Sequence, residues 1–185
     1  GDHSLAVTST GVLYSWGGNA AGQLGSTDLT GTSSPIAVAS PAAARSWRSV
    51  AHGTSFKLAI MNDYSLWAWG LNSAGQLGDG TTTNRLLPVQ IGTSSWSAIA
   101  AGSTGSYGIT TDGRLYAWGA GTTGQLGDLT AVAKSSPVLV SGPASTSWSS
   151  VAAGTNTCYA ITSLGRLYAW GNNTSNQLGD NTIVT

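Results

Sequence analysis

The 185-residue sequence has few ionisable side chains and contains no glutamate. Lysine and arginine together number 7, aspartate also numbers 7, and charged residues make up only 8% of the chain. An ordinary soluble domain has about 25% charged residues. Because the formal net charge is zero, the chain lacks the basic surplus with which proteins neutralise nucleic-acid phosphates. We therefore expect no direct binding to nucleic acid.

Residues that support common catalytic and metal chemistries are also scarce. The single cysteine, Cys158, excludes an internal disulfide and a cysteine-based zinc site. The two histidines, His3 and His52, and the seven aspartates form no recurring triad or carboxylate pair. Catalysis needs positioned titratable groups. The sequence therefore predicts a protein that is not an enzyme, with no catalytic residues, no metal site and no cofactor.

Long hydrophobic runs are missing as well. No run approaches the ~18 apolar residues that a transmembrane helix needs, so the sequence predicts no membrane span. The opposite extreme, disorder, is disfavoured because 41% of the residues are hydrophobic and 8 are tryptophan. A disordered chain has no means of burying so many large apolar side chains.

Glycine and tryptophan are abundant, and their positions repeat along the chain. A Trp-Gly pair occurs four times, at intervals of 53, 49 and 52 residues. Six residues after the Trp of each pair begins a Gly-Gln-Leu-Gly run, with Asn in place of the first Gly in the last copy. A single Trp then opens each following unit. These repeat positions are Trp16, Trp69, Trp118 and Trp170 in the pairs, Gly22, Gly75 and Gly124 in the runs, and Trp47, Trp96 and Trp148 as the single tryptophans.

Only one segment of the repeat varies in length. From each single Trp to the next Trp-Gly pair there are always 22 residues. By contrast, the stretch from the proline of each unit (Pro35, Pro88, Pro137) to the next single Trp covers 12, 8 and 11 residues. In repeat arrays, such insertions map to loops on one face, which is often the binding face.

Each unit contains four short apolar runs, which are bounded by Gly, Asn, Asp, Ser or Pro and are typical of β-strands. In the run before each Trp-Gly pair, two aromatic residues such as Tyr116 and Trp118 lie two positions apart and share one sheet face. Leu115 and Ala117 point to the other face, so both faces are apolar. Four short strands per ~50 residues, buried on both faces, favour the stacked blades of a propeller.

A tight turn joins the second and third runs of each unit. In the third unit it is Thr111-Asp112-Gly113-Arg114, which favours a type I′ hairpin because Asp-Gly tolerates positive φ at both central positions. Glycine stands at the equivalent position of the first and fourth units. In the second unit the residue is Tyr64, so we expect a different turn there.

Several of these motifs occur together in a known pattern. The runs His3–Val7 (HSLAV), Leu13–Gly17 (LYSWG), Gly22–Gly25 (GQLG), Ser34-Pro35 and Ser46–Gly53 (SWRSVAHG) resemble the repeat of the regulator of chromosome condensation family. The resemblance recurs four times and covers the whole chain. It implies an all-β fold, a β-propeller of four-stranded antiparallel blades that usually number seven to a ring.

The repeat phase predicts how the chain is divided. Residues 1–185 would form a single propeller segment with units at 1–46, 47–95, 96–147 and 148–185. Because the first and last units hold only three predicted strands each, we expect an incomplete ring of about four blades, two of them partial. Such a segment would be a piece of a longer chain, or a subunit that closes the ring by self-association.

The resemblance implies no single function, because the repeat residues build blades and do not select an activity. Members of the family include exchange factors for a nuclear GTPase, a plant ultraviolet-B photoreceptor, β-lactamase inhibitor proteins and scaffolds. The photoreceptor's Gly-Trp-Arg-His-Thr run is absent here. Three functions stay open: a non-enzymatic protein-interaction or structural module, an exchange factor or scaffold for a small GTPase, and a proteinaceous enzyme inhibitor. The Ser-, Thr- and Gly-rich, charge-poor composition favours a surface, secreted or phage-particle protein.

Most of the recurring residues have a structural explanation. We expect the tryptophans at the repeat positions to pack between blades, and the first Gly of each Gly-Gln-Leu-Gly run to adopt positive φ in a turn. Asp79, Asp128 and Asp180 follow three of the runs and are interpreted as turn-capping side chains. Tyr64 and Tyr107 break the repeat consensus, so exposure and a functional role stay open for these two.

The best candidates for contacting a partner, either a protein or a glycan, are charged residues in and beside loops on one propeller face. They are Arg45, Arg48, His52, Arg85 and Lys134. Arg85 and Lys134 share one phase of the repeat, so they should lie at equivalent places in neighbouring blades. The alternative explanation is a solvated charge for each cation, and a hydrogen-bonded structural histidine for His52.

Overall fold

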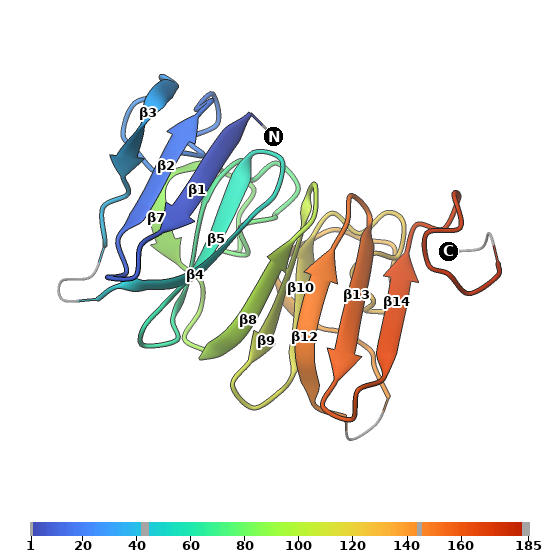
Figure 1. The fold of residues 1–185 in the computed structure, drawn as a ribbon. Helices are drawn as coiled ribbons and strands as arrows, with labels where there is room; N and C mark the ends of the chain where they lie inside the picture. The colour runs from blue at the N-terminus through green and yellow to red at the C-terminus, as the bar shows by residue number, and fades with distance from the viewer. Residues whose placement is uncertain (1, 42–44, 144–145, 183–185) are drawn as a thin grey trace.

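The computed structural model describes residues 2–41, 45–143 and 146–182, and within these ranges the regular secondary structure is entirely β (Figure 1). The strands are β1 (His3–Val7), β2 (Leu13–Gly17), β3 (Thr32–Ala37), β4 (Trp47–His52), β5 (Phe56–Met61), β6 (Leu66–Gly70), β7 (Arg85–Gln90), β8 (Trp96–Ala101), β9 (Gly105–Thr110), β10 (Leu115–Gly119), β11 (Lys134–Leu139), β12 (Trp148–Ala153), β13 (Thr157–Thr162) and β14 (Leu167–Gly171).

The strands form four antiparallel sheets in which chain neighbours are also sheet neighbours. The sheets are β1-β2-β3, β4-β5-β6-β7, β8-β9-β10-β11 and β12-β13-β14, here called blades 1 to 4. Figure 1 shows them side by side in chain order. The first strands of blades 2, 3 and 4 (β4, β8 and β12) contact one another, so they lie on the inner side of the array. The predicted fold class, all-β with blades of three or four antiparallel strands, is confirmed.

The Trp-Gly pair marks a bulge where the third strand of a blade meets the fourth. The pairing of β6 with β7 shifts register between Ala68 and Gly70, and the equivalent shift occurs in blades 1 and 3. Gly70 has φ of 101°, and a Cβ there would lie 2.5 Å from the carbonyl oxygen of Ser55. Only glycine fits this conformation and this contact, which explains why the pair recurs.

The hydrophobic core is divided among the junctions between blades. One cluster joins Leu13 and Val38 of blade 1 to Trp47 and Trp69 of blade 2, and equivalent clusters fill the next two junctions. Within blades 2, 3 and 4, the single Trp and the Trp of the Trp-Gly pair contact each other with ring centroids 5.8, 5.7 and 6.2 Å apart. The prediction that these rings pack between blades is confirmed.

Each junction is also closed by a hydrogen bond. The indole Nε1 of Trp69 donates to the carbonyl oxygen of Gln23 in the preceding blade, at 3.2 Å. Trp118 and Trp170 donate in the same way to the glutamine carbonyls of blades 2 and 3, each at 3.0 Å. The Trp-Gly pair and the Gly-Gln-Leu-Gly run therefore recur together because one bonds to the other across each junction.

The turns between the second and third strands differ from the prediction. In blade 3, Gly113 N–H donates to Thr110 O, and Gly113 has φ of 82° while Asp112 is not in the positive-φ region. The turn is thus a three-residue loop closed by one left-handed residue, not a type I′ turn. Tyr64 has φ of 67° and donates to Met61 O in the same pattern. The expected difference in the second unit was wrong, because Tyr64 adopts the same left-handed conformation as the glycines of the other turns.

The long loops after the third strands follow the sequence prediction. Gly22, Gly75 and Gly124 have φ of 81°, 78° and 69°. Asp79, Asp128 and Asp180 each accept a hydrogen bond at 3.0 Å from the backbone N–H two residues later, which confirms their turn-capping role. Within the described ranges, no helix has the length and apolar character needed to span a membrane.

Candidate protein-binding surface

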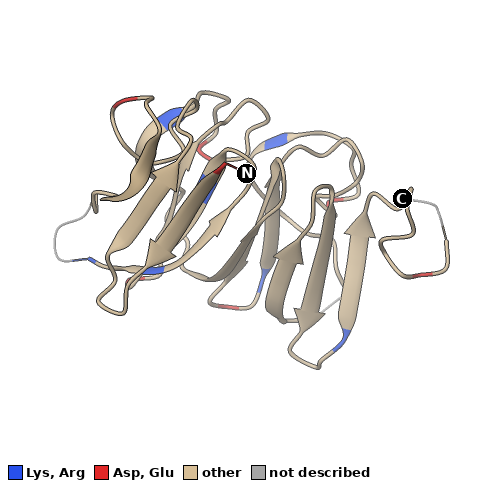
Figure 2. Ribbon diagram, turned by 45° about the horizontal axis from the view of Figure 1, so that its top comes forward, with Lys and Arg blue, Asp and Glu red and all other residues tan. Residues whose placement is uncertain are grey.

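The five predicted contact residues lie at opposite ends of the strands. Arg45 and Arg48 lie where the loops that join consecutive blades meet the turns between second and third strands. We call this end of the blades the linker face; the described residues of its inter-blade loops are 38–41, 45–46, 91–95, 140–143 and 146–147. His52, Arg85 and Lys134 lie at the other end. Figure 2 shows the charged segments mostly at these two ends of the sheets. The expectation of one shared face was therefore wrong.

Four of the five residues lie at strand ends, beside the loops. Arg48 and His52 lie in β4, Arg85 opens β7, and Lys134 opens β11. Strand pairing places Arg85 and Lys134, because the bulge at each Trp-Gly pair sets where the fourth strand begins. Arg45 alone lies in a connecting loop.

Arg85 and Lys134 are held by the loops that precede them. Arg85 Nε lies 2.7 Å from Asp79 Oδ2, and Lys134 Nζ lies 3.4 Å from Asp128 Oδ2. The two aspartates also cap their own turns. The equivalence of Arg85 and Lys134 in the repeat is confirmed, and each of them ties one blade's outer strand to its loop.

His52 lies near the inner side of the array, beside a buried basic pair. Its ring packs edge-on against that of His3, with centroids 5.6 Å apart. His3 is almost fully buried and its Nε2 has no hydrogen-bond partner. Burial, then the charges of Lys57 and His52, lower the pKa of His3 to about 4. Lys57 is fully buried, its Nζ also has no partner, and burial lowers its pKa to about 7.

The densest group of exposed functional side chains lies on the linker face of blade 2. Arg45 Nη1 is 2.6 Å from Asp63 Oδ2, and the guanidinium of Arg48 lies 5.1 Å from the centroid of the Tyr64 ring. We call Arg45, Arg48, Asp63 and Tyr64 the Tyr64 cluster. It joins the two arginines that the sequence singled out to a tyrosine that breaks the repeat.

The carboxylate of the cluster is fixed by its neighbours. Asp63 accepts hydrogen bonds from Ser65 Oγ at 2.6 Å and from Ser65 N–H at 3.1 Å. The Ser65 hydroxyl, with the Ser65 N–H and the Arg45 charge, lowers the pKa of Asp63 despite the opposing effect of burial. The cluster therefore presents two cations, one anion and an aromatic ring in a fixed arrangement at neutral pH.

Tyr64 has an unusual backbone for its size. Its φ of 67° lies in the left-handed region, whereas the equivalent residues are Gly11, Gly113 and Gly165. A residue with a Cβ costs roughly 1–2 kcal/mol in this conformation. The ring is 39% exposed, so it contributes less core packing than the buried aromatics. Strained residues of this kind concentrate at functional sites.

Sequence reasoning missed two members of these groups. Asp63 was not singled out, although it is the residue before the anomalous Tyr64. Lys57 was missed because a lysine between apolar residues is usually a solvated strand position. The available signal was the repeat itself, since the equivalent residues Ser106 and Cys158 are small.

The structure also places the residue types that bind metals or act as nucleophiles. Among residues 2–41, 45–143 and 146–182, no three His, Cys, Asp or Glu side chains gather closely enough to hold a metal ion. Cys158 is fully buried, and burial raises the pKa of its thiol, which suppresses the thiolate needed for nucleophilic chemistry. Tyr107 is also buried, and its hydroxyl donates to Gln125 O at 2.9 Å, so its departure from the repeat has a structural reason.

Comparison with known proteins gives relatives for both sequence and fold. The ultraviolet-B receptor UVR8 of Arabidopsis thaliana is 37% identical over 89 residues, which is 48% of this chain and 20% of the receptor. The X-linked retinitis pigmentosa GTPase regulator of Canis lupus familiaris is 33% identical over 90 residues, 49% of this chain and 9% of the regulator. The chain thus spans a fifth or less of these relatives.

Solved structures give a wider match. Human WBSCR16 superposes with a TM-score of 0.89 and 28% identity over 99% of this chain and 48% of its own. Yeast RCC1 (Prp20), solved with Kap60, gives a TM-score of 0.83 at 24% identity over 99% of this chain and 45% of its own; this likeness concerns the fold alone. The chain therefore corresponds to about half of each of these propellers.

The family model covers most of the described sequence. The regulator of chromosome condensation (RCC1) repeat matches residues 10–60, 64–109 and 112–161, and a second model of the same repeat matches residues 96–125 and 148–177. The matched residues include the Trp-Gly pairs and glutamines that join the blades. The chain belongs to the regulator of chromosome condensation (RCC1) repeat family and forms part of a β-propeller.

Proposed function

We propose that this propeller segment is a non-enzymatic protein-interaction module whose partner docks on the Tyr64 cluster. One observation carries the proposal: Tyr64 occupies a left-handed turn position that three equivalent turns give to glycine. Glycine would hold the turn without strain. The tyrosine must therefore bring a benefit outside the turn, and a protein contact is the benefit that fits its exposure.

The composition of the cluster supports a protein partner. Tyrosine and arginine are enriched among the residues that dominate binding energy at protein interfaces. Here Arg48 lies over the Tyr64 ring, and Arg45 is oriented by Asp63. Both ions of that pair are partly exposed, so a partner would complete their desolvation and gain specificity from the two signs of charge.

Structural relatives support the same class of function. Prp20p from Saccharomyces cerevisiae, one of the solved relatives, has binding properties to Gsp1p and histones, and a second structure holds yeast RCC1 bound to Kap60. These partners are proteins. For this chain we infer the class of partner from them, without the individual names.

The test uses Tyr64→Gly, which restores the residue of the other turns. We expect the free energy of unfolding to change by no more than about 1 kcal/mol, because relief of strain offsets the lost contact with Arg48 and the entropy of glycine. A partner recovered from the native source and purified should bind Tyr64→Gly and Arg48→Ala at least about tenfold more weakly than wild type, as measured by calorimetry.

Arg114→Ala is the matched control. Arg114 also lies beside a turn of the linker face and pairs with Asp112 at 3.2 Å, but it belongs to blade 3. Its removal should change the affinity less than twofold. The proposal fails if the purified partner binds Tyr64→Gly as tightly as wild type.

Regulation of a GTPase is a second candidate, favoured by the name of the GTPase regulator among the sequence relatives. Nucleotide release from a panel of purified small GTPases tests it. Acceleration by wild type, lost in Tyr64→Gly, would identify the partner as a GTPase. The enzyme-inhibitor alternative and the surface, secreted or phage-particle location remain predictions of the sequence.

A further inference from the structure

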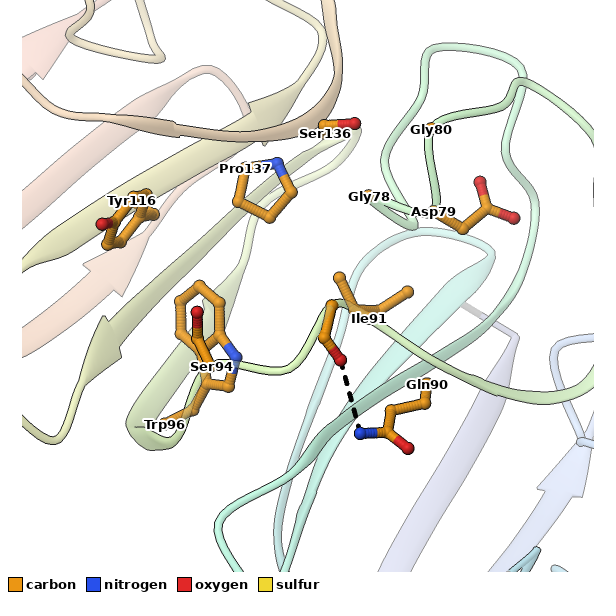
Figure 3. A pocket seen from close by; sticks show the side chains of 11 residues that line it. Gly78, Asp79, Gly80, Gln90, Ile91, Ser94, Trp96, Tyr116, Ser136 and Pro137 are labelled. Carbon is orange, nitrogen blue, oxygen red and sulfur yellow. Dashed lines mark hydrogen bonds between the residues drawn. The ribbon is translucent and has the colours of Figure 1, made fainter.

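A cavity of about 400 Å³ lies at the junction of blades 2 and 3. Its walls come from Ile91 after β7, Trp96 at the start of β8, Tyr116 in β10 and Pro137 in β11. Figure 3 shows these four side chains around one space, with Ser136 at its edge. The cavity has the size of a small-ligand site, and it is lined by aromatic and aliphatic groups.

One polar group in the cavity wall has no partner. Trp96 is 2% exposed, and its indole Nε1 makes no hydrogen bond. In Figure 3 this nitrogen is turned toward Ile91, across the cavity floor. A buried N–H without an acceptor destabilises the fold, because the group has lost its hydrogen bond to water. An occupant that supplies a carbonyl oxygen would recover this free energy.

The cavity offers no free charge to an occupant. The carboxylate of Asp79, the only charged side chain among its lining residues, is bonded to Arg85 and Thr81. Figure 3 shows that carboxylate turned away from the cavity. The remaining polar groups at the rim include the hydroxyls of Ser94 and Ser136. An uncharged occupant is therefore favoured over an ion, which would lose its hydration without compensation.

The residues that line this cavity differ from those at the junction of blades 1 and 2, whereas Val140, Trp148 and Tyr168 line an equivalent cavity of about 270 Å³ at the junction of blades 3 and 4. At the equivalent positions of blade 2, facing blade 1, Leu87 and Trp67 stand where Ser136 and Tyr116 stand in blade 3. Trp47, the counterpart of Trp96, also has an unpartnered Nε1. At both junctions the indole Nε1 of the single Trp has no hydrogen-bond partner. Of these two, only the junction of blades 2 and 3 has the smaller residues Ser136 and Tyr116 in the cavity wall.

The cavity adjoins the Tyr64 cluster. The backbone N–H of Trp96 donates to the carbonyl oxygen of Tyr64 at 2.8 Å, so the residue that forms the cavity floor is bonded to the strained turn. A partner lying on Tyr64 and Arg48 would have the cavity beside it. This continuity selects a protein segment as the occupant.

We propose that the cavity between blades 2 and 3 receives an uncharged aliphatic or prolyl side chain of the protein partner, with a backbone carbonyl of that segment accepting the hydrogen bond of Trp96 Nε1. The inference rests on the proposed protein-binding function and adds the chemistry of the anchoring residue. The walls of Ile91 and Pro137 select an apolar group.

The test uses single-residue probes with the intact chain. N-acetyl-leucinamide and N-acetyl-prolinamide carry the proposed side chains and two amide carbonyls; N-acetyl-lysinamide and N-acetyl-aspartamide are charged counterparts, and methyl glucoside represents a glycan. Each is titrated to about 50 mM, a range suited to millimolar affinity, while the assigned indole N–H signals are followed by NMR. We expect a saturable shift of the Trp96 signal with the two uncharged amides alone.

Ser136→Leu is the matched variant, since it copies the residue of the neighbouring junction. Ser136 is exposed, so the variant should fold, and we expect it to weaken probe binding at least fivefold. Tyr64→Gly should leave probe binding unchanged while it weakens the protein partner. This difference separates the two proposals: probe binding without any effect of Tyr64→Gly on the partner would overturn only the proposed docking surface.

Three results would overturn the cavity proposal. They are the absence of any saturable shift of the Trp96 signal, an equal shift with the charged amides or methyl glucoside, and an unchanged affinity of Ser136→Leu for the uncharged amides. A shift confined to another tryptophan would likewise count against it, because it would place the probes elsewhere on the chain.

Discussion

At the scale of single residues, Lys57 departs most from its expected surroundings. It lies in β5, opposite His52 and Trp69 in the neighbouring strands, with no exposed surface and no hydrogen-bond partner for Nζ. The equivalent residue Ser106 instead donates from Oγ to the carbonyl oxygen of Gln76 at 2.6 Å. Blade 2 therefore carries a buried amine where blade 3 carries a satisfied hydroxyl.

This amine makes stability depend on pH. The pKa of Lys57 is about 7 in the folded chain and 10.5 as the ordinary value, so between these values the unfolded chain binds more protons. The contribution of Lys57 to stability therefore rises with pH from about 7 to about 10.5, by a few kcal/mol at most. We expect Lys57→Ser to abolish this rise and to be more stable than wild type at pH 7. Urea unfolding at pH 7 and pH 9.5 measures both effects.

Two comparisons keep this prediction specific. Lys134→Ser removes the ion pair with Asp128 and should retain the alkaline rise of the wild type. The pKa of His3, lowered to about 4, gives a separate rise between about pH 4 and 6.5, which Lys57→Ser should leave present. An alkaline rise of the same size in Lys57→Ser and wild type would contradict the assignment to Lys57.

Two residues have surroundings that the sequence could not give, and both cases share one cause. Lys57 and Tyr64 each occupy a position whose backbone and burial are set by the surrounding blades, against the ordinary preference of the side chain. Propensity predicts a solvated lysine and a non-left-handed tyrosine. The repeat could expose both as exceptions, but it could not show that the lysine lacks a partner or that Arg48 covers the tyrosine.

At the scale of elements, the long loops are organised by one buried asparagine. Asn72 Nδ2 donates to the carbonyl oxygens of Thr81 and Thr83, each at 3.0 Å, and its Oδ1 accepts from Leu77 N–H at 2.9 Å. Asn19 and Asn173 occupy the same position in blades 1 and 4. The side chain thus replaces the strand pairing that the loop lacks.

Blade 3 lacks this device. Gly121 stands at the asparagine position, and a Cβ there would lie 2.4 Å from the carbonyl oxygen of Val132. The loop backbone therefore fills the space of the missing side chain. The same loop holds Leu129, which is 89% exposed with φ of 64°. We infer that this loop is the least constrained of the described long loops.

Amide exchange tests the role of the asparagine. Leu77 N–H is bonded to Asn72, whereas Gly121 offers the equivalent Leu126 N–H no side-chain acceptor. We expect Leu126 to exchange at least tenfold faster than Leu77, and Asn72→Ala to bring Leu77 to the rate of Leu126 while lowering stability by about 2–4 kcal/mol, because it removes several buried hydrogen bonds. Equal rates for Leu77 and Leu126 in the wild type would show that the asparagine is dispensable.

Element positions were largely predictable, and element geometry was not. The short apolar runs around the single tryptophans and the Trp-Gly pairs became strands because both of their faces are apolar. The turn at Thr111–Gly113 was misassigned because Asp-Gly fits two turn types, and the chain chooses between them by the register of β9 with β10. The position of Arg85 at the start of β7 was not predictable either, since the bulge that places it is invisible as a sequence pattern.

At the scale of the whole molecule, the blades pack in a row, each against the next one in the chain. Each apolar cluster joins one blade to the next, and the described core holds no cluster that joins three. This arrangement follows directly from the repeat, which is why the fold class was predictable from sequence alone. The repeat positions are the same in every blade, so they could not identify a binding face; the proposed face rests on the unequal residues of blade 2 and of its junction with blade 3.

Nearest-neighbour packing predicts an order of local stability. All residues of β5, β6 and β9 are buried, whereas β1 and β14 are half-buried or exposed along most of their lengths. We expect amides of β5, β6 and β9 to exchange only on global unfolding, and those of β1 and β14 to exchange at least a hundredfold faster. Repeating the measurement at tenfold higher protein concentration tests whether copies associate through the outer blades, since association would slow β1 and β14 selectively. Uniform protection of all four blades at both concentrations would contradict the nearest-neighbour account.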